Sequence, residues 1–527
     1  MPNPTLQPTL TPEPVVQLVN SFREPYNLAV ATARTCYSSR VITTSDVSKD
    51  EQSREQRDRI AQSVYQAGHH TTIQHPTFQF VLEKVSRQFI WSFLHAHPYY
   101  NSEQVSQRYV EVKPGNFTVP PLDDAPRAVY AETVHLLMDA YHRLIDLIRP
   151  TVEQEYKRLF PSRSLEEKRW ASAIKKRSQE VARYVLPVAT HAHLYHTISG
   201  LTLHRYWRLC KQFDTPLEQA VVIERMVEAV RAVDPEFVDL AQDPIPLEQT
   251  LEYQAFERFR EARQMRASNA FIDEFDAELD GLTSKLVDSS QDAEGILAQA
   301  VRSMLGLTRP ELDDTAAIDL VMNPASNPYL SDSLNLTTLS KLSRAMSHPH
   351  FTFKKKLSHT ADSQDQRHRM VPGSRPILSA HFVNGRPDYI VPPLIRACPE
   401  AESFYRETMA RIWIAVDKLL NSGVSEEFAL YLLPNAFPIR FEESGDLLNL
   451  HHKWVHRLCY TAQEEIWSAC RDETLQVSQR FPRIGQYIKA PCWVRAQGGV
   501  KPHCPEGDRF CGVPVWKLPL ESYARLI

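Results

Sequence analysis

Glycine is scarce in this sequence. Only 15 of the 527 residues are glycine, which is less than half of the roughly 7% that is usual in proteins. Neither GxGxxG, the pattern of dinucleotide-binding folds, nor GxxxxGK followed by Ser or Thr, the pattern of triphosphate-binding loops, occurs in the chain. The glycine-rich phosphate loops are therefore excluded, and any nucleotide must be held by side chains.

Long apolar runs are missing as well, because none reaches the roughly 18 residues that a membrane-spanning helix needs. The first residues, MPNPTLQPTLTPEPVVQL, have neither the basic start nor the apolar stretch of a secretory signal. The net charge of -4 provides no overall attraction for nucleic acid. Together these absences predict a cytoplasmic, globular protein with no membrane and no nucleic-acid partner.

The eight cysteines include no C-x-x-C pair, and this use is typical of reduced thiols. Four residues near the C-terminal end could bind zinc: Cys492, His503, Cys504 and Cys511. Their spacing matches no standard zinc ribbon or finger. We therefore assign no metal from the sequence and leave structural zinc open.

Helical periodicity dominates the pattern of apolar residues. Apolar side chains at spacings of three and four between Tyr130 and Ile148 predict one long helix. Similar patterns predict helices over 54–66, 217–233 and 402–420, whereas short β-like pieces occur at 78–82 and 389–391. The length suggests two to four domains at roughly 150 residues each. We expect a helix-rich α+β fold.

Three motifs occur twice, in the same order. HPTFQF at 75–80 returns as HPHFTF at 348–353, EVARYVLP at 180–187 as EFALYLLP at 427–434, and WRLC at 207–210 as HRLC at 456–459. Such ordered echoes indicate a tandem duplication. The predicted organisation is a first domain over 1–245, a helical connector over 246–317, a second domain over 318–490 and a C-terminal tail over 491–527.

Two polar clusters could carry chemistry, one in each copy. On a helix or tight turn, Glu103, Ser106, Arg108 and Tyr109 would offer a carboxylate, a hydroxyl, a guanidinium and a phenol, which could grip a phosphate and a heterocycle together. In the second copy, Arg367-His368-Arg369 form a candidate anion clamp. A solvated turn and a basic surface loop are the alternative interpretations.

Other charges near these motifs have different interpretations. Lys354, Lys355 and Lys356 are expected to form a solvated face. Arg183 lies in an otherwise apolar stretch, where a charge must be paired or bind an anion. The second copy has Leu430 at this position, so the fold tolerates an apolar residue there, and this asymmetry favours a ligand role for Arg183.

The motifs resemble those of the flavin-dependent thymidylate synthases, whose signature runs Arg-His-Arg, two residues, Ser, one residue, then Asn-Glu-x-Ser-x-Arg-Tyr. In the first copy the similar segments are HHTTIQHPTFQF at 69–80, VSRQ at 85–88, SEQVSQRYV at 102–110 and EVARYVLP at 180–187. In the second copy they are HPHFTF, Gln364, the triplet at 367–369, LYLLP at 430–434 and RLCYTAQEEI at 457–466.

Each copy departs from the signature in a different place. The first has His95-Ala96-His97 where the arginine triplet belongs. The second keeps the triplet but has PGSRP at 372–376 in place of the Ser-x-Arg-Tyr end, and Leu430 in place of Arg183. Family sites are built where subunits meet. Because the losses are complementary, we expect a hybrid site with one wall from each copy.

The resemblance implies a role for each matching position. The catalytic cations are Arg457 and Arg367, which polarise the pyrimidine. The dUMP-binding residues are Ser106, Arg108, Arg183, Gln364, Arg367 and Arg457. The flavin-binding residues are His69, Thr71, Tyr109, His368 and Arg369. Gln74 stands where a flavin-contacting glutamate is common, and Arg208 is the counterpart of Arg457 in the first copy.

The resemblance also implies the reaction, which is reductive methylation of dUMP to dTMP with FAD as cofactor, methylenetetrahydrofolate as carbon donor and NADPH as reductant. It further implies a homodimer that mimics the four-copy assembly of the family. Two other functions stay open: a catalytically silent descendant that binds a nucleotide, and a related flavoenzyme that acts on another nucleotide.

Overall fold

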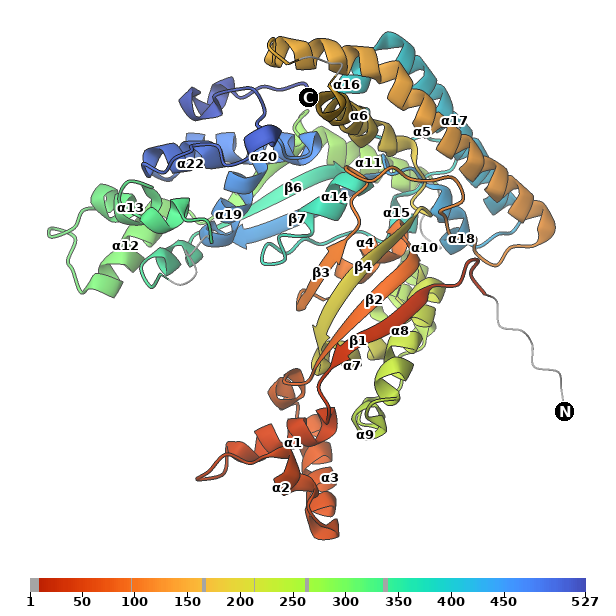
Figure 1. Ribbon diagram of the computed structural model, residues 1–527, viewed down its shortest axis with the longest axis vertical. Helices are drawn as coiled ribbons and strands as arrows, with labels where there is room; N and C mark the ends of the chain where they lie inside the picture. The colour runs from red at the N-terminus through yellow and green to blue at the C-terminus, as the bar shows by residue number, and fades with distance from the viewer. Residues whose placement is uncertain (1–8, 96, 164–166, 213, 261–264, 335–339) are drawn as a thin grey trace. The chain divides into compact units, whose positions relative to one another are not determined.

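The computed structural model describes residues 9–95, 97–163, 167–212, 214–260, 265–334 and 340–527 (Figure 1). It is helix-rich with two small sheets, so the predicted α+β class is confirmed. Within the described residues, no helix is long and apolar enough to cross a membrane. The predicted helices all form: α3 (Glu51–Gln66), α5 (Asp124–Leu159), α8 (Pro216–Arg231) and α17 (Pro399–Asn421).

The chain divides into two compact units that are not continuous in sequence. The first unit comprises Met1–Asp139, Leu186–Gln264 and Arg411–Leu433, and the second comprises Ala140–Val185, Met265–Ala410 and Pro434–Ile527. Each unit thus takes most of its residues from one sequence repeat and one helical segment from the other. This division differs from the boundaries expected from the sequence, which treated each repeat as a continuous domain.

The first unit is built on a four-stranded antiparallel sheet of order β1-β2-β4-β3. Its strands are β1 (Val15–Ser21), β2 (Thr77–Ser86), β3 (Tyr100–Gln104) and β4 (His191–Ser199). Alternate residues of β2, namely Phe78, Phe80 and Leu82, are fully buried, because side chains two apart lie on the same face of a strand. Helix α8 packs against β1 and β2 (Figure 1).

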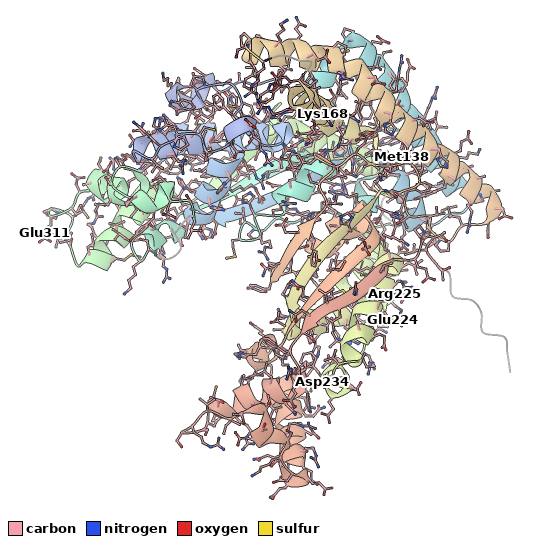
Figure 2. All side chains as sticks on the ribbon, in the orientation of Figure 1. Met138, Lys168, Glu224, Arg225, Asp234 and Glu311 are labelled. Atoms are coloured by element: carbon pink, nitrogen blue, oxygen red, sulfur yellow. The ribbon has the colours of Figure 1, made fainter. Side chains whose placement is uncertain are left out.

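The first unit contains further helices besides α3 and α8. They are α1 (Pro25–Thr35), α2 (Thr44–Ser48), α4 (Arg87–His95), α7 (Gly200–Arg208), α9 (Pro235–Asp239), α10 (Leu251–Arg260) and α18 (Glu426–Ala429). Asp234, labelled in Figure 2, accepts from the backbone N–H groups of Phe237 at 3.1 Å and Tyr26 at 2.8 Å. This one carboxylate therefore caps α9 and ties it to α1.

The second unit is built on a three-stranded antiparallel sheet of order β5-β6-β7. The strands are β5 (Ser284–Ser289), β6 (His350–Ser358) and β7 (Pro438–Asp446), and α20 (Glu464–Arg480) packs against β5 and β6. The other helices are α6 (Lys168–Ala182), α11 (Met265–Leu279), α12 (Ala293–Leu305), α13 (Asp314–Met322), α14 (His359–Asp365), α15 (Leu378–His381), α16 (Pro393–Arg396), α19 (Leu447–Arg457), α21 (Pro482–Gly485) and α22 (Pro491–Gln497).

The two sheets repeat the same plan. In each, a central strand (β2 or β6) lies between a preceding strand (β1 or β5) and a later one (β4 or β7). The β-like piece predicted at 78–82 lies within β2. The strand predicted at Tyr389–Val391 does not form, so that prediction was wrong. The N–H of Ile390 donates one hydrogen bond to the carbonyl of Ala436, but no ladder of such bonds follows. Strand β5 begins inside the segment expected to be a connector.

A buried tyrosine, carboxylate and serine tie the exchanged segment into each unit. In the first unit, Tyr431 donates to Glu218 at 2.5 Å, and Ser86 donates its N–H at 2.7 Å and its hydroxyl at 2.6 Å to the same carboxylate. In the second unit, Tyr184 donates to Glu465 at 2.6 Å, and the hydroxyl of Ser358 donates at 2.7 Å.

Each tyrosine comes from the repeat that does not supply the sheet. Tyr184 belongs to EVARYVLP of the first copy, and Tyr431 to EFALYLLP of the second. The carboxylates occupy equivalent places, in the first turns of α8 and α20. A buried carboxylate without partners is costly, so these contacts fix which segment completes which unit. We call each set a tyrosine-carboxylate lock.

We predict that Tyr184→Phe and Tyr431→Phe each lower the free energy of unfolding by about 1–3 kcal/mol, because each removes a hydrogen bond to a buried carboxyl group. Urea unfolding of the full chain measures the change. Tyr37→Phe is the matched control, since the Tyr37 side chain is 94% exposed. Equal stability of all three variants would show that the locks do not hold the exchanged segments.

Candidate functional site

The arginine triplet of the second copy lies in a turn directly after α14. The N–H of Arg367 donates to the carbonyl of Gln364 at 3.2 Å, and the N–H of His368 donates to that of Asp365 at 3.0 Å. Arg367 is exposed, whereas His368 and Arg369 are partly buried. The turn therefore presents one arginine to solvent and directs the histidine inward.

Arg457, the last residue of α19, meets this turn. Its Nε donates to Nε2 of His368 at 2.8 Å, and its Nη2 donates to the carbonyl of Gln364 at 3.3 Å. Burial lowers the pKa of His368 well below its ordinary value, and the charge of Arg457 lowers it further. The neutral imidazole thus accepts from Arg457. Three residues predicted from separate motifs come together here.

Arg183 lies in the same unit, in the 3-10 turn Arg183–Val185 that follows α6. Its side chain is almost completely buried, and its Nε donates to the carbonyl of Glu180 at 3.0 Å. Burial raises the pKa of Glu465, while the charge of Arg183 acts in the opposite direction. The structure therefore places this cation beside the tyrosine-carboxylate lock of the second unit.

The candidate residues of the first copy lie in the first unit. Strand β3 ends at Gln104, and Ser106 begins a turn in which its hydroxyl accepts from the N–H of Arg108 at 3.3 Å. The guanidinium of Arg108 lies 5.4 Å from the ring centroid of Tyr109, and that ring is 52% exposed. The expected helix or tight turn is a turn, and Glu103 precedes it on the strand.

Two further flavin-contact candidates, His69 and Thr71, are exposed around the 3-10 turn His70–Gln74 that precedes β2. Of the sequence that replaces the triplet in this copy, Ala96 lies outside the described residues. Nε2 of His97 is 2.8 Å from Nη1 of Arg205. Burial and the charge of Arg205 lower the pKa of His97 to about 4.

This pairing identifies a residue that the motifs missed. Arg208, expected as the counterpart of Arg457, donates instead to the carbonyl of Asp243. Arg205, one helical turn earlier on α7, makes the arginine–histidine contact that Arg457 makes in the second unit. Sequence alignment on WRLC and HRLC equates the wrong arginines, because it cannot show which side of the helix faces the turn.

A buried ion cluster, which the sequence did not predict, supports the second-unit site. Nζ of Lys453 is 2.8 Å from Asp365 and 2.5 Å from Glu443. Nζ of Lys355 is 3.1 Å from Asp365 and 2.9 Å from Glu443. Arg375 adds a contact to the neighbouring Asp362 at 2.9 Å. We call this set the ion cluster.

The expectation that Lys354, Lys355 and Lys356 form a solvated face is wrong. Lys355 is fully buried, because alternate residues of β6 point into the unit, and its two neighbours pair with Glu278 and Asp276. Burial acts to lower the pKa of Lys355, but the surrounding carboxylates outweigh it and hold that pKa well above its ordinary value.

The ion cluster fixes both elements that carry the candidate site. Asp365 lies three residues before His368, at the end of α14, and Lys453 lies one helical turn before Arg457 on α19. Counted from HPTFQF and HPHFTF, the position of Lys355 is Leu82 in the first unit, which is also fully buried. The fold accepts an apolar residue there, so the charge serves a purpose particular to the second unit.

The PGSRP segment of the second copy also has a structural explanation. Arg375 lies in the ion cluster, and its guanidinium is 4.3 Å from the ring centroid of Phe441. The N–H of Ser374 donates to the carbonyl of Glu442, so the segment runs beside β7. The arginine that follows the triplet in this copy is thus committed to carboxylates of its own unit.

Comparison with known proteins extends the sequence resemblance. The sequence model of the family described as thymidylate synthase complementing protein matches residues 17–236 and 285–483, most of the chain. The chain belongs to this family. Two matched regions agree with two diverged halves, and the second region begins at β5. The resemblance inferred from the motifs is confirmed.

Individual relatives are distant. The flavin-dependent thymidylate synthase of Clostridium tetani is 28% identical over 196 residues, 37% of this chain and 72% of that protein. The one of Nitratidesulfovibrio vulgaris is 26% identical over 228 residues, 42% of this chain and 85% of that protein. The one of Sulfurisphaera tokodaii is 30% identical over 153 residues, 28% of this chain and 57% of that protein.

Among solved structures, a UMP/dUMP methylase, PolB from Streptomyces cacaoi bound with 5-Br dUMP, aligns with 43% of this chain and 94% of its own. The identity is 19% and the TM-score 0.31. The class of enzyme expected from the sequence, a methyltransferase of the flavin-dependent thymidylate synthase family, is confirmed by the family match and the named relatives.

We predict that Lys355→Met lowers the free energy of unfolding by about 3–5 kcal/mol, because it removes one of the two lysines that neutralise the buried carboxylates of Asp365 and Glu443. Leu82→Met, at the equivalent place in the first unit, is the matched control and costs less than about 1.5 kcal/mol. Denaturant unfolding of the full chain measures both. If the two changes cost the same, the cluster does not hold the second unit together.

Proposed function

We propose that this protein is an FAD-dependent thymidylate synthase that methylates dUMP to dTMP, with methylenetetrahydrofolate as carbon donor and NADPH as reductant. The observation that carries the proposal is the contact of Arg457 with His368 and with the carbonyl of Gln364. It gathers three motif residues at one point of a chain that belongs to the family. The relatives named above are flavin-dependent thymidylate synthases.

Fixed positive charge is what the reaction requires from the protein. Carbon 5 of uracil becomes nucleophilic when negative charge accumulates on the ring carbonyl oxygens, so a preorganised cation beside them lowers the barrier. Arg457 and Arg367 suit this task because a guanidinium stays charged at every relevant pH. His368, neutral because it is buried and near Arg457, orients that guanidinium without neutralising it.

The residues proposed to hold FAD fit an anionic, planar group. The partly buried Arg369 can pair with a pyrophosphate. The half-exposed ring of Tyr109 offers a surface for stacking, and His69 and Thr71 are exposed beside β2. When bound, the flavin supplies the hydride chemistry. The residues of this chain position the nucleotide and keep the positive charge in place.

We further propose that both sets of residues act on the same nucleotide. Ser106 and Arg108 would hold its sugar and phosphate, with Arg183 on the phosphate or base, and Gln364 would face the pyrimidine. The support is the complementary loss of motif residues in the two copies. A homodimer and a cytoplasmic location belong to the same proposal and stay predictions.

The first expected outcome is a yellow protein. Purified full-length chain should show flavin absorbance, or acquire it when FAD is added, and should rescue a thymidine-requiring bacterial strain. A chain that stays colourless with added FAD would indicate a silent descendant, and bound FAD without rescue would indicate a flavoenzyme for another nucleotide.

Arg457→Ala should lower the rate of dTMP formation by at least about 100-fold, which corresponds to the roughly 3 kcal/mol that one preorganised donor contributes. Arg208→Ala is the matched control, because its guanidinium donates to Asp243 instead of to the triplet turn. Steady-state assays measure the rate of dTMP formation by both variants. Equal losses would show that Arg457 has no special role.

Arg367→Ala should abolish activity although the first copy is untouched, and Arg183→Leu, which copies Leu430, should weaken dUMP binding. The readouts are dTMP formation for the first variant and a dUMP titration for the second, with unfolding curves as a check of folding. Full activity of Arg367→Ala would disprove that the two copies share one site.

A further inference from the structure

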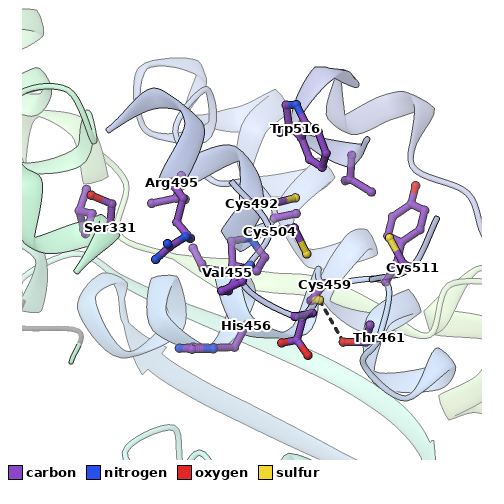
Figure 3. Close-up of a pocket in the computed structure, with 18 of the residues that line it drawn as sticks. Ser331, Val455, His456, Cys459, Thr461, Cys492, Arg495, Cys504, Cys511 and Trp516 are labelled. Carbon is purple, nitrogen blue, oxygen red and sulfur yellow. Dashed lines mark hydrogen bonds between the residues drawn. The ribbon is translucent and has the colours of Figure 1, made fainter. Parts of the chain in front are cut away.

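A cavity of about 370 Å³ lies in the second unit beside helix α19 (Figure 3). Its walls come from α19, from α22, from the segment that follows α22 and from residues 330–333. Part of this wall belongs to the family framework, and the rest lies beyond residue 483, where the family match ends. An apolar cavity of roughly 150 Å³ is large enough to bind benzene. This cavity therefore has room for a compound with two fused rings.

Most of the wall is apolar, and three aromatic side chains take part in it: Tyr460, Phe510 and Trp516. The ring centroids of Phe510 and Trp516 are 6.1 Å apart. Aliphatic side chains complete this part of the wall, namely Leu330, Leu448, Val455, Val494, Val513 and Val515. Aromatic side chains pack well against flat ring systems, and small-molecule sites are commonly lined in this way. The wall therefore favours a flat compound that contains rings.

Four cysteines also line the cavity: Cys459, Cys492, Cys504 and Cys511. Burial raises the pKa of Cys492 to about 12, and it also raises the pKa values of Cys504 and Cys511. No group of three or more His, Cys, Asp or Glu side chains in the described part of the chain is arranged to hold a metal ion. His503, which the sequence grouped with three of these cysteines, does not line the cavity. The three thiols with a raised pKa are therefore neutral, polarisable wall groups.

The cavity disfavours positive charge as well. His451 of α19 is 5% exposed, and burial lowers its pKa to about 4, so its imidazole is neutral. Among the described residues that line the cavity, Arg495 is the one fixed cation, and Asp332 and Glu506 are the carboxylates. Nε and Nη2 of Arg495 both donate to the carbonyl of Pro502, at 3.2 Å. Because desolvation penalises charge of either sign, the ligand that suits this cavity is uncharged.

The molecules of the proposed reaction do not suit this cavity. dUMP, FAD, NADPH and methylenetetrahydrofolate all carry phosphate or carboxylate groups, which need an excess of cations around them. The lining has the reverse balance of charges. Neither Arg457 nor His368 lines the cavity. The cavity is therefore separate from the candidate site, and its ligand is a different compound.

His456 offers the hydrogen bonds that a neutral heterocycle needs. It lines the cavity from α19, and its ring centroid is 4.5 Å from that of His452. The structure shows no hydrogen bond between this imidazole and any of the described residues. A neutral imidazole has one donor and one acceptor nitrogen. An N–H or O–H group on the edge of a ring can therefore bond to His456.

We propose that this cavity binds a neutral, flat heteroaromatic compound of one or two rings, with an N–H or O–H group at its edge. The rings of the compound lie against Phe510 and Trp516, and its polar edge bonds to His456. The compound thereby contacts both α19 and the segment after α22. The proposal does not depend on the proposed reaction, because no residue that lines the cavity is assigned a role in that reaction.

Calorimetric titration of the full-length protein with three compounds that share one ring system tests the class of ligand. Indole is neutral and has a ring N–H, whereas indole-3-acetate is an anion and tryptamine a cation at neutral pH. We expect saturable binding of indole and at least about tenfold weaker binding of both charged compounds, because burying a charge is costly. No saturable binding of indole, or equal or tighter binding of either charged compound, would overturn the proposal.

A pair of tryptophan variants tests the place of binding. Trp516→Ala should weaken indole binding at least about tenfold, because it removes a large aromatic wall. Trp493→Ala is the matched control: Trp493 lies on α22 next to Cys492, but it does not line the cavity, and its ring lies 4.8 Å from Nζ of Lys489. This variant should bind indole as the unmutated chain does. Equal losses in the two variants would contradict the assignment.

The thiols allow the same test on the unmutated chain, which avoids misfolded variants. Saturating indole should slow the modification of Cys459, Cys492, Cys504 and Cys511 by N-ethylmaleimide, since all four line the cavity. Cys36 is exposed and should react at the same rate with and without indole, so it is an internal control. Mass spectrometry follows each cysteine. Unchanged rates at all four cysteines would show that indole binds elsewhere and would disprove the site. None of these readouts depends on enzyme activity.

Discussion

The need of a buried carboxylate for hydrogen-bond donors shapes this protein. Glu218 and Glu465 begin equivalent helices, and each is satisfied by a serine of its own sheet and by a tyrosine of the other repeat. Each repeat carries the tyrosine, but that tyrosine donates to the carboxylate of the other repeat. These exchanged contacts accompany the exchange of segments between the compact units.

The two units share the tyrosine-carboxylate lock but differ at other buried positions. At equivalent positions of the central strand, one unit buries Leu82 and the other buries Lys355. The lysine brings with it Lys453, Asp365 and Glu443, which link the helix of Arg457 to the turn of His368. A buried ion cluster is a poor source of stability. Its role here is to hold α19, which carries Arg457, against the end of α14, which leads into the turn of His368.

The C-terminal segment lies beyond the family match. Its cysteines line one cavity together with Cys459, two residues past Arg457. The ion cluster constrains α19 on one side, and the thiol-lined cavity lies at its end. Both features lie beside the same helix. In the equivalent helix of the first unit, α7, the last residue, Arg208, donates instead to the carbonyl of Asp243.

The sequence by itself determined the helices, the two family-like halves and the family, and it named Gln364, His368 and Arg457 as candidate site residues, because periodicity and ordered motifs are local properties of the chain. It could not determine that these three residues meet. It could not determine which repeat completes which unit, since that depends on contacts such as Tyr184 with Glu465 between residues 281 apart. Nor could it show that Lys355 is buried, that Arg205 replaces Arg208, or that Cys459 joins the C-terminal thiols. Each of these depends on which side of a strand or helix faces a neighbour, and only tertiary packing decides that.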